Sequence, residues 1–196
     1  MSPVHRMMQH GLIHENVPLG PLTTYKSGGP ARYLIHVPDS AALVELAESG
    51  DIGDVPVLVL GRGSNLVVSD RGFPGLVIRL GEGFARLGFD GDQAVAGAAM
   101  ALPRVARAAV EQPLAGLEFF VGIPGSVGGA VRQNAGCFGY ETKDRLVQAT
   151  VVELSTGAIS VRTPEDLDLS YRHSNIASTE VVVEAVFKGV PGNAEA

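Results

Sequence analysis

The chain has 196 residues, of which 45% are hydrophobic and 18% charged, so it can bury a sizeable core and is not expected to be disordered. Its formal charge of −6 makes neither nucleic acid nor an anionic membrane the expected partner, and no apolar run is long enough for a membrane span. The single cysteine, Cys137, excludes an intrachain disulfide framework, and no metal-ligand set is predicted. Residues 1–15 lack the apolar stretch of a secretory signal, so the expected location is the cytoplasm.

The first part of the chain is predicted to be a β-rich lobe with one helix. Residues 1–15 are expected to form a flexible segment, and the lobe is expected to run from residue 16 to residue 81. Asp39 or Ser40 would cap the helix and Gly50 would end it. The strands are predicted by short apolar runs between turn residues, and the elements are a helix over Ser40–Ser49 and strands over Tyr33–Val37, Val57–Leu60, Leu66–Val68 and Leu76–Leu80.

The second part, residues 82–190, is predicted to be another lobe, followed by a tail over residues 191–196. Apolar residues at helical spacing predict an amphipathic helix over Leu102–Gln112. The turn residues Ser155–Gly157 predict a hairpin between flanking strands. The strands are expected over Ala94–Ala96, Val147–Leu154, Ala158–Arg162 and Glu180–Phe187. No linker separates the two parts, so we predict an α+β chain of two lobes.

The first candidate site is the segment Gly61-Arg62-Gly63-Ser64-Asn65, which follows a predicted buried strand. Its glycines would let successive backbone N–H groups converge on an anion such as a pyrophosphate, and Ser64 and Asn65 would add side-chain donors. The dinucleotide-binding fingerprint fails, because Leu66 stands where its third glycine belongs. An ordinary turn between strands is the alternative interpretation.

The second candidate site is the glycine-dense stretch Gly122–Ala130, which continues through Asn134-Ala135-Gly136. Its nonpolar members are small or branched, so we expect the stretch to be largely buried. Buried backbone needs hydrogen-bond partners, and a cofactor with phosphates and a flat ring system would supply them. A set of packed turns is the alternative interpretation.

The third candidate site is Tyr171-Arg172-His173-Ser174. The planar guanidinium of Arg172 could hold a carboxylate or stabilise an enolate, although an exposed ion pair is the alternative. His173 is interpreted as a partly exposed histidine rather than a base, and Cys137 as a small buried side chain rather than a nucleophile. Ser126 does not stand in the Gly-x-Ser-x-Gly elbow of a hydrolase.

Together these segments resemble the MurB family, the UDP-N-acetylenolpyruvoylglucosamine reductases, over about Asn16 to Phe187. Four motifs occur in the same order as in that family: Leu22–Tyr25 with Gly28–Ala31, Val59–Leu66, Gly116–Phe119 leading into Gly122–Gly129 and Asn134–Gly136, and Tyr171–Ser174. The resemblance implies a two-lobed FAD-binding domain of the vanillyl-alcohol-oxidase/PCMH type.

The resemblance also implies a reaction and its cofactors. The enzyme would reduce UDP-N-acetylglucosamine enolpyruvate to UDP-N-acetylmuramate for peptidoglycan precursors, with FAD as cofactor and NADPH as hydride donor. Arg172 would be the catalytic arginine, and Tyr171, Arg172 and Ser174 would bind the UDP-sugar substrate. The residues that would bind FAD are Gly61, Arg62, Gly63, Ser64, Asn65, Ile123, Pro124, Gly125, Ser126, Gly128, Gly129, Asn134 and Gly136.

This sequence departs from the family's pattern in one respect. Members of the family usually continue into a C-terminal substrate-binding domain with a serine proton donor and a glutamate, and neither is found in this sequence. We therefore expect impaired activity, since a positioned acid contributes ~10²–10⁴-fold to a rate. The alternative is a non-catalytic FAD-binding module, either a degraded remnant or one part of a split enzyme completed by a separate polypeptide. An oxidase is disfavoured, because no histidine or cysteine stands in a flavin-attachment motif.

Overall fold

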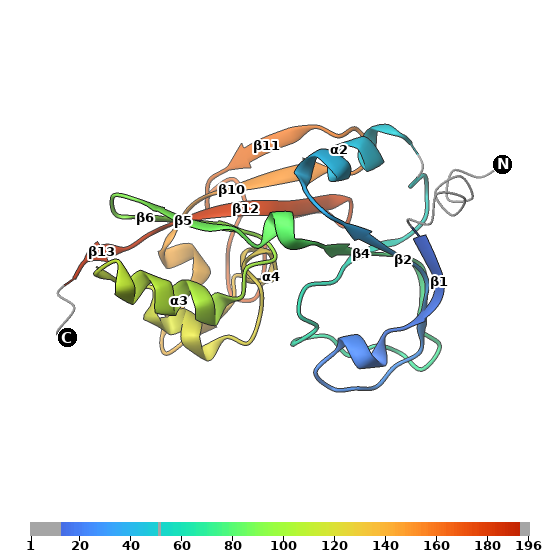
Figure 1. Ribbon diagram of the computed structural model, residues 1–196, viewed down its shortest axis with the longest axis horizontal. Coiled ribbons are helices and arrows are strands. Elements are labelled where there is room, and N and C mark those ends of the chain that lie inside the picture. The colour runs from blue at the N-terminus through green and yellow to red at the C-terminus, as the bar shows by residue number, and fades with distance from the viewer. Residues whose placement is uncertain (1–12, 51, 193–196) are drawn as a thin grey trace.

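The computed structural model describes residues 13–50 and 52–192, which form two larger β-sheets with helices packed around them (Figure 1). One sheet has four strands in the order β1-β2-β4-β3, and the other has five in the order β11-β10-β12-β6-β5. This combination of mixed sheets and helices confirms the predicted α+β class. None of the described helices is long and apolar enough to cross a membrane.

The four-stranded sheet consists of β1 (Ile13–Pro18), β2 (Pro30–Val37), β3 (Val57–Val59) and β4 (Phe73–Leu80). β1 is antiparallel to β2, whereas β2 and β3 both run parallel to β4. The short helix η1 (Gly20–Leu22) follows β1. β1 begins inside the segment expected to be flexible, since Ile13–Glu15 pair with β2; residues 1–12 of that segment lie outside the described residues.

Helix α2 (Ser40–Glu48) crosses from β2 to β3, as predicted. The Ala42 N–H donates to the Asp39 carboxylate at 3.0 Å, which confirms Asp39 as the cap. Leu43 and Leu46 of α2 share one buried cluster with Ile78 of β4 and with Val181 of β12 (Glu180–Lys188). This helix therefore packs on both larger sheets, and the boundary between lobes at residues 81 and 82 stays a proposal.

The strand predicted over Leu66–Val68 is wrong, because residues 61–72 form an irregular loop. The loop lies against the chain before β2, where the Gly29 N–H donates to the Ser69 C=O at 2.8 Å. Leu66 and Val68 pack against the small core that contains Leu34. Their apolar character thus reflects burial beneath the sheet and not pairing within it.

The five-stranded sheet is antiparallel throughout. The hairpin across Ser155–Gly157 is confirmed, with Gly157 at a positive φ of 74°. β5 was not predicted, and the 3-10 helix η2 (Glu82–Phe84) leads into it from the first sheet. The strands are β5 (Leu87–Asp90), β6 (Gln93–Gly97), β10 (Leu146–Glu153), β11 (Ile159–Arg162) and β12 (Glu180–Lys188).

One face of this sheet is covered by α3 (Leu102–Glu111), η3 (Glu118–Gly122), α4 (Val127–Gln133) and η4 (Thr142–Asp144), while α2 lies on the other face (Figure 1). α3 is confirmed. Two short ribbons complete the fold: β8 (Gly136–Cys137) with β9 (Tyr140–Glu141), and β7 (Leu114–Ala115) with β13 (Val190–Pro191). Pro191, expected to begin the tail, therefore belongs to a strand, and residues 193–196 lie outside the described residues.

Candidate functional site

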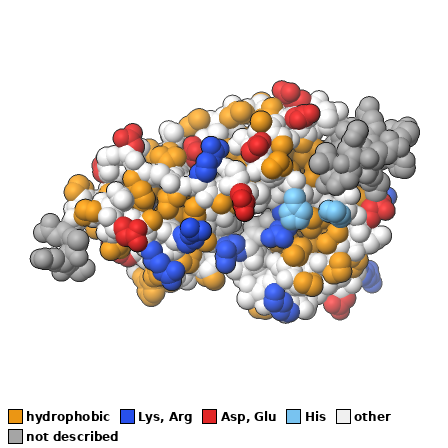
Figure 2. Space-filling view, in the orientation of Figure 1, with side chains coloured by type: hydrophobic (Ala, Val, Ile, Leu, Met, Phe, Trp, Pro, Cys, Tyr) orange, Lys and Arg blue, Asp and Glu red, His pale blue; other side chains and the backbone are white. Residues whose placement is uncertain are grey.

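A cleft lies between the two larger sheets, and it contains two adjoining cavities of about 450 and 470 Å³. The space-filling view shows the molecule hollowed between its two halves, with Lys and Arg side chains near the hollow (Figure 2). We call the cavity beside β3 and β12 the first cavity and the one beside Arg172 the second cavity. The residues that line both are Leu58, Val59, Leu60, Gly61, Arg62, Ser126, Gly129 and Arg132.

The segment Gly61–Asn65 leaves the end of β3 and lines the second cavity along its whole length. Within residues 13–50 and 52–192, none of its five backbone N–H groups donates a hydrogen bond. Gly63 has a φ of 64°, and a Cβ atom there would lie 2.3 Å from the Leu22 carbonyl oxygen. A run of unpaired N–H groups at a glycine turn is suited to an anion, which favours the cradle over an ordinary turn.

The segment Ile123–Ser126 joins η3 to α4 and lines the second cavity. Backbone hydrogen bonds fix both of its ends: the Ile123 N–H donates to the Phe120 carbonyl at 3.2 Å, and the Leu102 N–H donates to the Gly125 carbonyl at 3.1 Å. Gly129 lines both cavities, whereas Gly128 lines the first. These glycines belong to a helix, α4, which was not predicted.

The expectation that this glycine-dense stretch is largely buried holds only in part. Ser126, Val127 and Ala130 are buried, but Gly122 and Pro124 are exposed. Gly122 and Pro124 are exposed toward the cleft, since both residues line the second cavity.

The two predicted segments face each other across one cleft. The Asn65 amide donates to the Gln133 side-chain oxygen at 2.6 Å, joining residues 68 positions apart in the sequence. A Cβ atom on Gly61 would lie 2.5 Å from the Ser126 Oγ. Backbone from both segments can therefore contact a single ligand.

Arg172 lies at the tip of a tight turn, in which Ser170 and His173 exchange backbone hydrogen bonds of 3.2 and 3.0 Å. Its φ is 55°, and its guanidinium donates to the Gly136 carbonyl at 3.4 Å. Arg172 and Gly136 both line the second cavity. In the described part of the chain no carboxylate forms an ion pair with Arg172, so the alternative of an exposed ion pair has no support.

Two residues expected to bind substrate do not border the cleft. The Tyr171 side chain is 79% exposed and lies beside the Arg172 guanidinium, 5.5 Å from the ring centroid. The Ser174 hydroxyl donates to the Arg132 carbonyl at 2.6 Å. Neither lines either cavity, so their contact with substrate stays a prediction.

The side chain of Asn134, which is expected to bind FAD, is fully buried, and its contact with FAD stays a prediction. Its amide donates to Glu141 at 3.0 Å and to the Ser170 carbonyl at 2.9 Å, and its oxygen accepts from the Lys143 N–H at 2.9 Å. Asn134 also ends α4 in the left-handed conformation, with φ 42°. It therefore positions α4, the β8–β9 hairpin and the Arg172 turn relative to one another.

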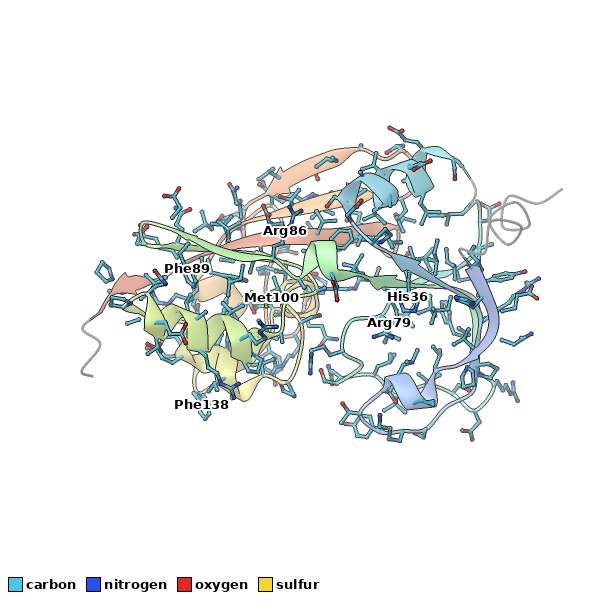
Figure 3. All side chains as sticks on the ribbon, viewed as in Figure 1. His36, Arg79, Arg86, Phe89, Met100 and Phe138 are labelled. Carbon is cyan, nitrogen blue, oxygen red and sulfur yellow. The ribbon has the colours of Figure 1, made fainter. Side chains whose placement is uncertain are left out.

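Several cleft residues were not predicted from the sequence. Figure 3 shows His36 and Arg79 on neighbouring strands, and Arg79 lines the first cavity. Burial, Arg79 and His14 together lower the pKa of His36. Arg132 also lines the cleft and donates to the carbonyls of Ile176 and Ala177 at 3.2 and 3.0 Å.

Glu180 is a buried carboxylate in the wall of the first cavity. It forms an ion pair with Arg162 and accepts a hydrogen bond from the Ala177 N–H at 2.7 Å. Burial alone would raise the pKa of Glu180, but these hydrogen bonds and the charges of Arg162 and Arg132 hold it below its usual value. Glu180 was not predicted from the sequence, where the only indication of it is an acidic residue at the start of an otherwise apolar strand.

The remaining chemical candidates are not assembled into a site. Cys137 is half-buried, and His173 is exposed. Among the described residues there is no group of three His, Cys, Asp or Glu side chains that could hold a metal ion.

The fold and the paired backbone segments define an FAD-binding domain. The model of the family described as FAD binding domain matches residues 32–161, and the chain belongs to this family. A solved structure of Phl p 4, a glucose dehydrogenase, has the same fold, with a TM-score of 0.70 at 13% identity over 99% of this chain and 45% of that one. The predicted vanillyl-alcohol-oxidase/PCMH type of fold is confirmed.

Within this class the chain is similar to the UDP-N-acetylenolpyruvoylglucosamine reductases, which confirms the predicted resemblance. The reductase of Parvibaculum lavamentivorans is 45% identical over 185 residues, covering 94% of this chain and 59% of that protein. The reductase of Azorhizobium caulinodans is 43% identical, covering 93% and 58%. The crystal structure of MurB from Thermus caldophilus gives a TM-score of 0.80 at 37% identity, over 92% of this chain and 64% of that one. The chain thus spans about three fifths of the length of these relatives.

The residues of the cleft fit FAD, the cofactor of this family. The unpaired N–H groups of Gly61–Asn65 suit its diphosphate, and Gly61 leaves room where a side chain would enter the cleft. Gly61 and Arg62 of this cradle line both cavities, so a dinucleotide held there could extend into each of them.

Proposed function

We propose that the chain forms the FAD-binding part of a reductase that converts UDP-N-acetylglucosamine enolpyruvate to UDP-N-acetylmuramate in the cytoplasm, with NADPH as hydride donor. The observation that carries the proposal is the convergence of Gly61–Asn65, Ile123–Ser126 and Arg172 on one cleft. The relatives of that name add support through their sequence identity. Since the chain spans about three fifths of their length, the activity of the whole protein is part of the proposal.

The cleft residues would have distinct tasks in binding. The backbone N–H groups of Gly61–Asn65 would hold the diphosphate, with Ser64 and Asn65 adding side-chain donors. Ile123, Pro124 and Gly125 would lie against the flavin ring in the second cavity. This placement leaves the rim at Arg172 open to a second ligand, because Arg172 is exposed.

When bound, FAD supplies the hydride chemistry that no amino-acid side chain can perform. Arg172 would place its guanidinium beside the enolpyruvyl group of the substrate. Negative charge develops on that group as the double bond is reduced, and a fixed cation stabilises it. Gly136 orients this cation by accepting a hydrogen bond from it.

We also propose that residues 16–81 and 82–190 act as the two lobes that enclose the cofactor. The cleft between the two larger sheets supports this division, because its walls come from β3 on one side and from α4 and β12 on the other. Interaction with a separate polypeptide would be needed only if the chain by itself failed to bind the UDP-sugar.

Anaerobic flavin spectroscopy tests the proposal. The purified chain, loaded with FAD, should lose its visible flavin absorbance when NADPH is added and regain it, at the slow rate expected of impaired activity, when UDP-N-acetylglucosamine enolpyruvate follows. UDP-N-acetylglucosamine, which lacks the enolpyruvyl group, is the matched control and should restore nothing. If the flavin bleaches and the enolpyruvyl sugar does not restore its absorbance, the chain by itself is an FAD-binding module only. If the chain does not take up FAD, the proposal is overturned.

A further inference from the structure

Two hydrogen bonds tie the segment Gly61–Asn65 to other parts of the described chain. The Thr24 N–H donates to the Gly63 carbonyl at 3.0 Å, and the Asn65 amide donates to the Gln133 side-chain oxygen at 2.6 Å. Thr24 lies between β1 and β2 of the four-stranded sheet, and the segment follows β3 of the same sheet. Among the described residues, the bond to Gln133 is therefore the one that joins the segment to the opposite wall of the cleft.

Gln133 is the better supported member of this pair. It is the last residue of α4, and the next residue, Asn134, has a fully buried side chain. The Asn134 amide donates to the Glu141 carboxylate at 3.0 Å and to the Ser170 carbonyl at 2.9 Å, which fixes this end of the helix. The segment Gly61–Asn65 has no comparable support. Gln133 thus acts as the anchor, and the Asn65 side chain is the group that it holds.

This hydrogen bond selects which atom of the Asn65 amide is held at the cavity. Asn65 and Gln133 both line the second cavity, and both are exposed at its rim. A side-chain amide has an oxygen that only accepts hydrogen bonds and a nitrogen that carries two N–H groups. Because Gln133 offers its oxygen, it selects the Asn65 nitrogen and uses one of the two N–H groups. The second N–H has no partner among the described residues, so a ligand can accept a hydrogen bond from it.

The choice of atom matters because the proposed ligand at this segment is an anion. The terminal torsion of an asparagine side chain is broad and roughly two-fold, so an unrestrained amide would present its oxygen about as readily as its nitrogen. An oxygen in this place would repel a diphosphate, and turning the amide on binding would add an ordering cost. A donor that is already oriented avoids both effects.

We propose that Gln133 is a positioning residue for FAD binding, which holds the Asn65 amide so that its second N–H donates to the diphosphate. Gln133 itself makes no contact with the cofactor in this assignment. The hydrogen bond makes the two walls of the cleft act together on one group of the ligand, since Asn65 comes from the cradle and Gln133 from α4. The inference rests on the proposed placement of FAD in the cleft.

Gln133→Met tests the inference, because methionine has a similar length but offers no oxygen to the Asn65 amide. Titration of the flavin-free variant with FAD, followed by fluorescence, should show about fivefold weaker binding than in the parent. Gln112→Met, at the exposed residue that follows α3, is the matched control and should bind FAD as the parent does. Equal affinity of Gln133→Met and the parent would overturn the inference alone, whereas a parent chain that binds no FAD would overturn the proposed function with it.

A double-mutant cycle separates positioning from any other effect of Gln133. Asn65→Ala removes the amide, so in that background Gln133→Met should cause no further loss of FAD affinity. Phosphorus NMR of bound FAD gives a second readout: Gln133→Met should shift a diphosphate resonance when Asn65 is present and leave it in place in Asn65→Ala. A further loss of affinity in the Asn65→Ala background would mean that Gln133 acts on FAD directly or through the fold, and the assignment would be wrong.

Discussion

Replacing Gly61 with valine is expected to weaken FAD binding by about 100-fold, equivalent to ~3 kcal/mol of binding free energy. Gly61 lies where the two cavities join, and its missing side chain leaves the space that the diphosphate would occupy. A Cβ atom there would already lie 2.5 Å from the Ser126 Oγ, so the added methyl groups would project into the cleft. Gly61 has no positive φ, and the backbone itself accepts a side chain without strain.

The matched control is Gly88→Val on β5, where an added Cβ would meet no atom within 4 Å. Gly88→Val should unfold at about the temperature of the parent, whereas Gly61→Val loses some stability through its contact with Ser126, so its affinity is measured well below its own unfolding temperature. Titration of flavin-free protein with FAD, followed by fluorescence, measures the affinities. If Gly61→Val bound FAD as tightly as Gly88→Val, the diphosphate could not lie at the junction of the two cavities.

Replacing Arg172 with lysine is expected to slow reoxidation of the reduced flavin by the enolpyruvyl UDP-sugar about 100-fold, with FAD affinity nearly unchanged. The arginine projects from a turn in which its own φ is 55°, and Gly136 fixes one of its nitrogens. Lysine keeps the charge but offers a flexible point charge in place of a planar fork. The loss should therefore fall on the step in which charge develops on the substrate.

Stopped-flow absorbance measures this step in a preparation whose parent turns over, after reduction by NADPH. Arg107→Lys, on the exposed side of α3, is the control for a change of arginine to lysine away from the cleft. If Arg172→Lys is reoxidised at the parental rate, Arg172 takes no part in the chemical step. An equal loss of FAD affinity would instead make it a residue that binds the cofactor.

The fold could be predicted where local pattern and tertiary environment agree. α3 follows a clear helical spacing of apolar residues, and the cap of α2 follows from Asp39. α4 could not be predicted, because Gly128 and Gly129 are poor helix formers and the helix depends on packing against β12 and the backbone of Ala98. β5 was missed because its four residues include a glycine and match no strand pattern.

The site shows the same division between local and distant information. The Gly61–Asn65 cradle could be predicted because a glycine turn after a buried strand has a local signature. The buried position of Asn134 could not be predicted, since one of the groups that satisfy its side chain, the Ser170 carbonyl, lies 36 residues further along the chain. The position of Arg79 in the wall of the first cavity depends on the order of the strands in the sheet, and the sequence pattern does not reveal that order.

Amide hydrogen exchange tests the central claim most directly, because that claim concerns backbone N–H groups. Without FAD, the amides of Gly61–Asn65 should exchange rapidly, since in the described structure they have no hydrogen-bond partner. With FAD bound they should become strongly protected, while the β5–β6 hairpin should exchange as before. Unchanged rapid exchange at Gly61–Asn65 in the FAD-saturated protein would contradict the claim that this segment holds the diphosphate.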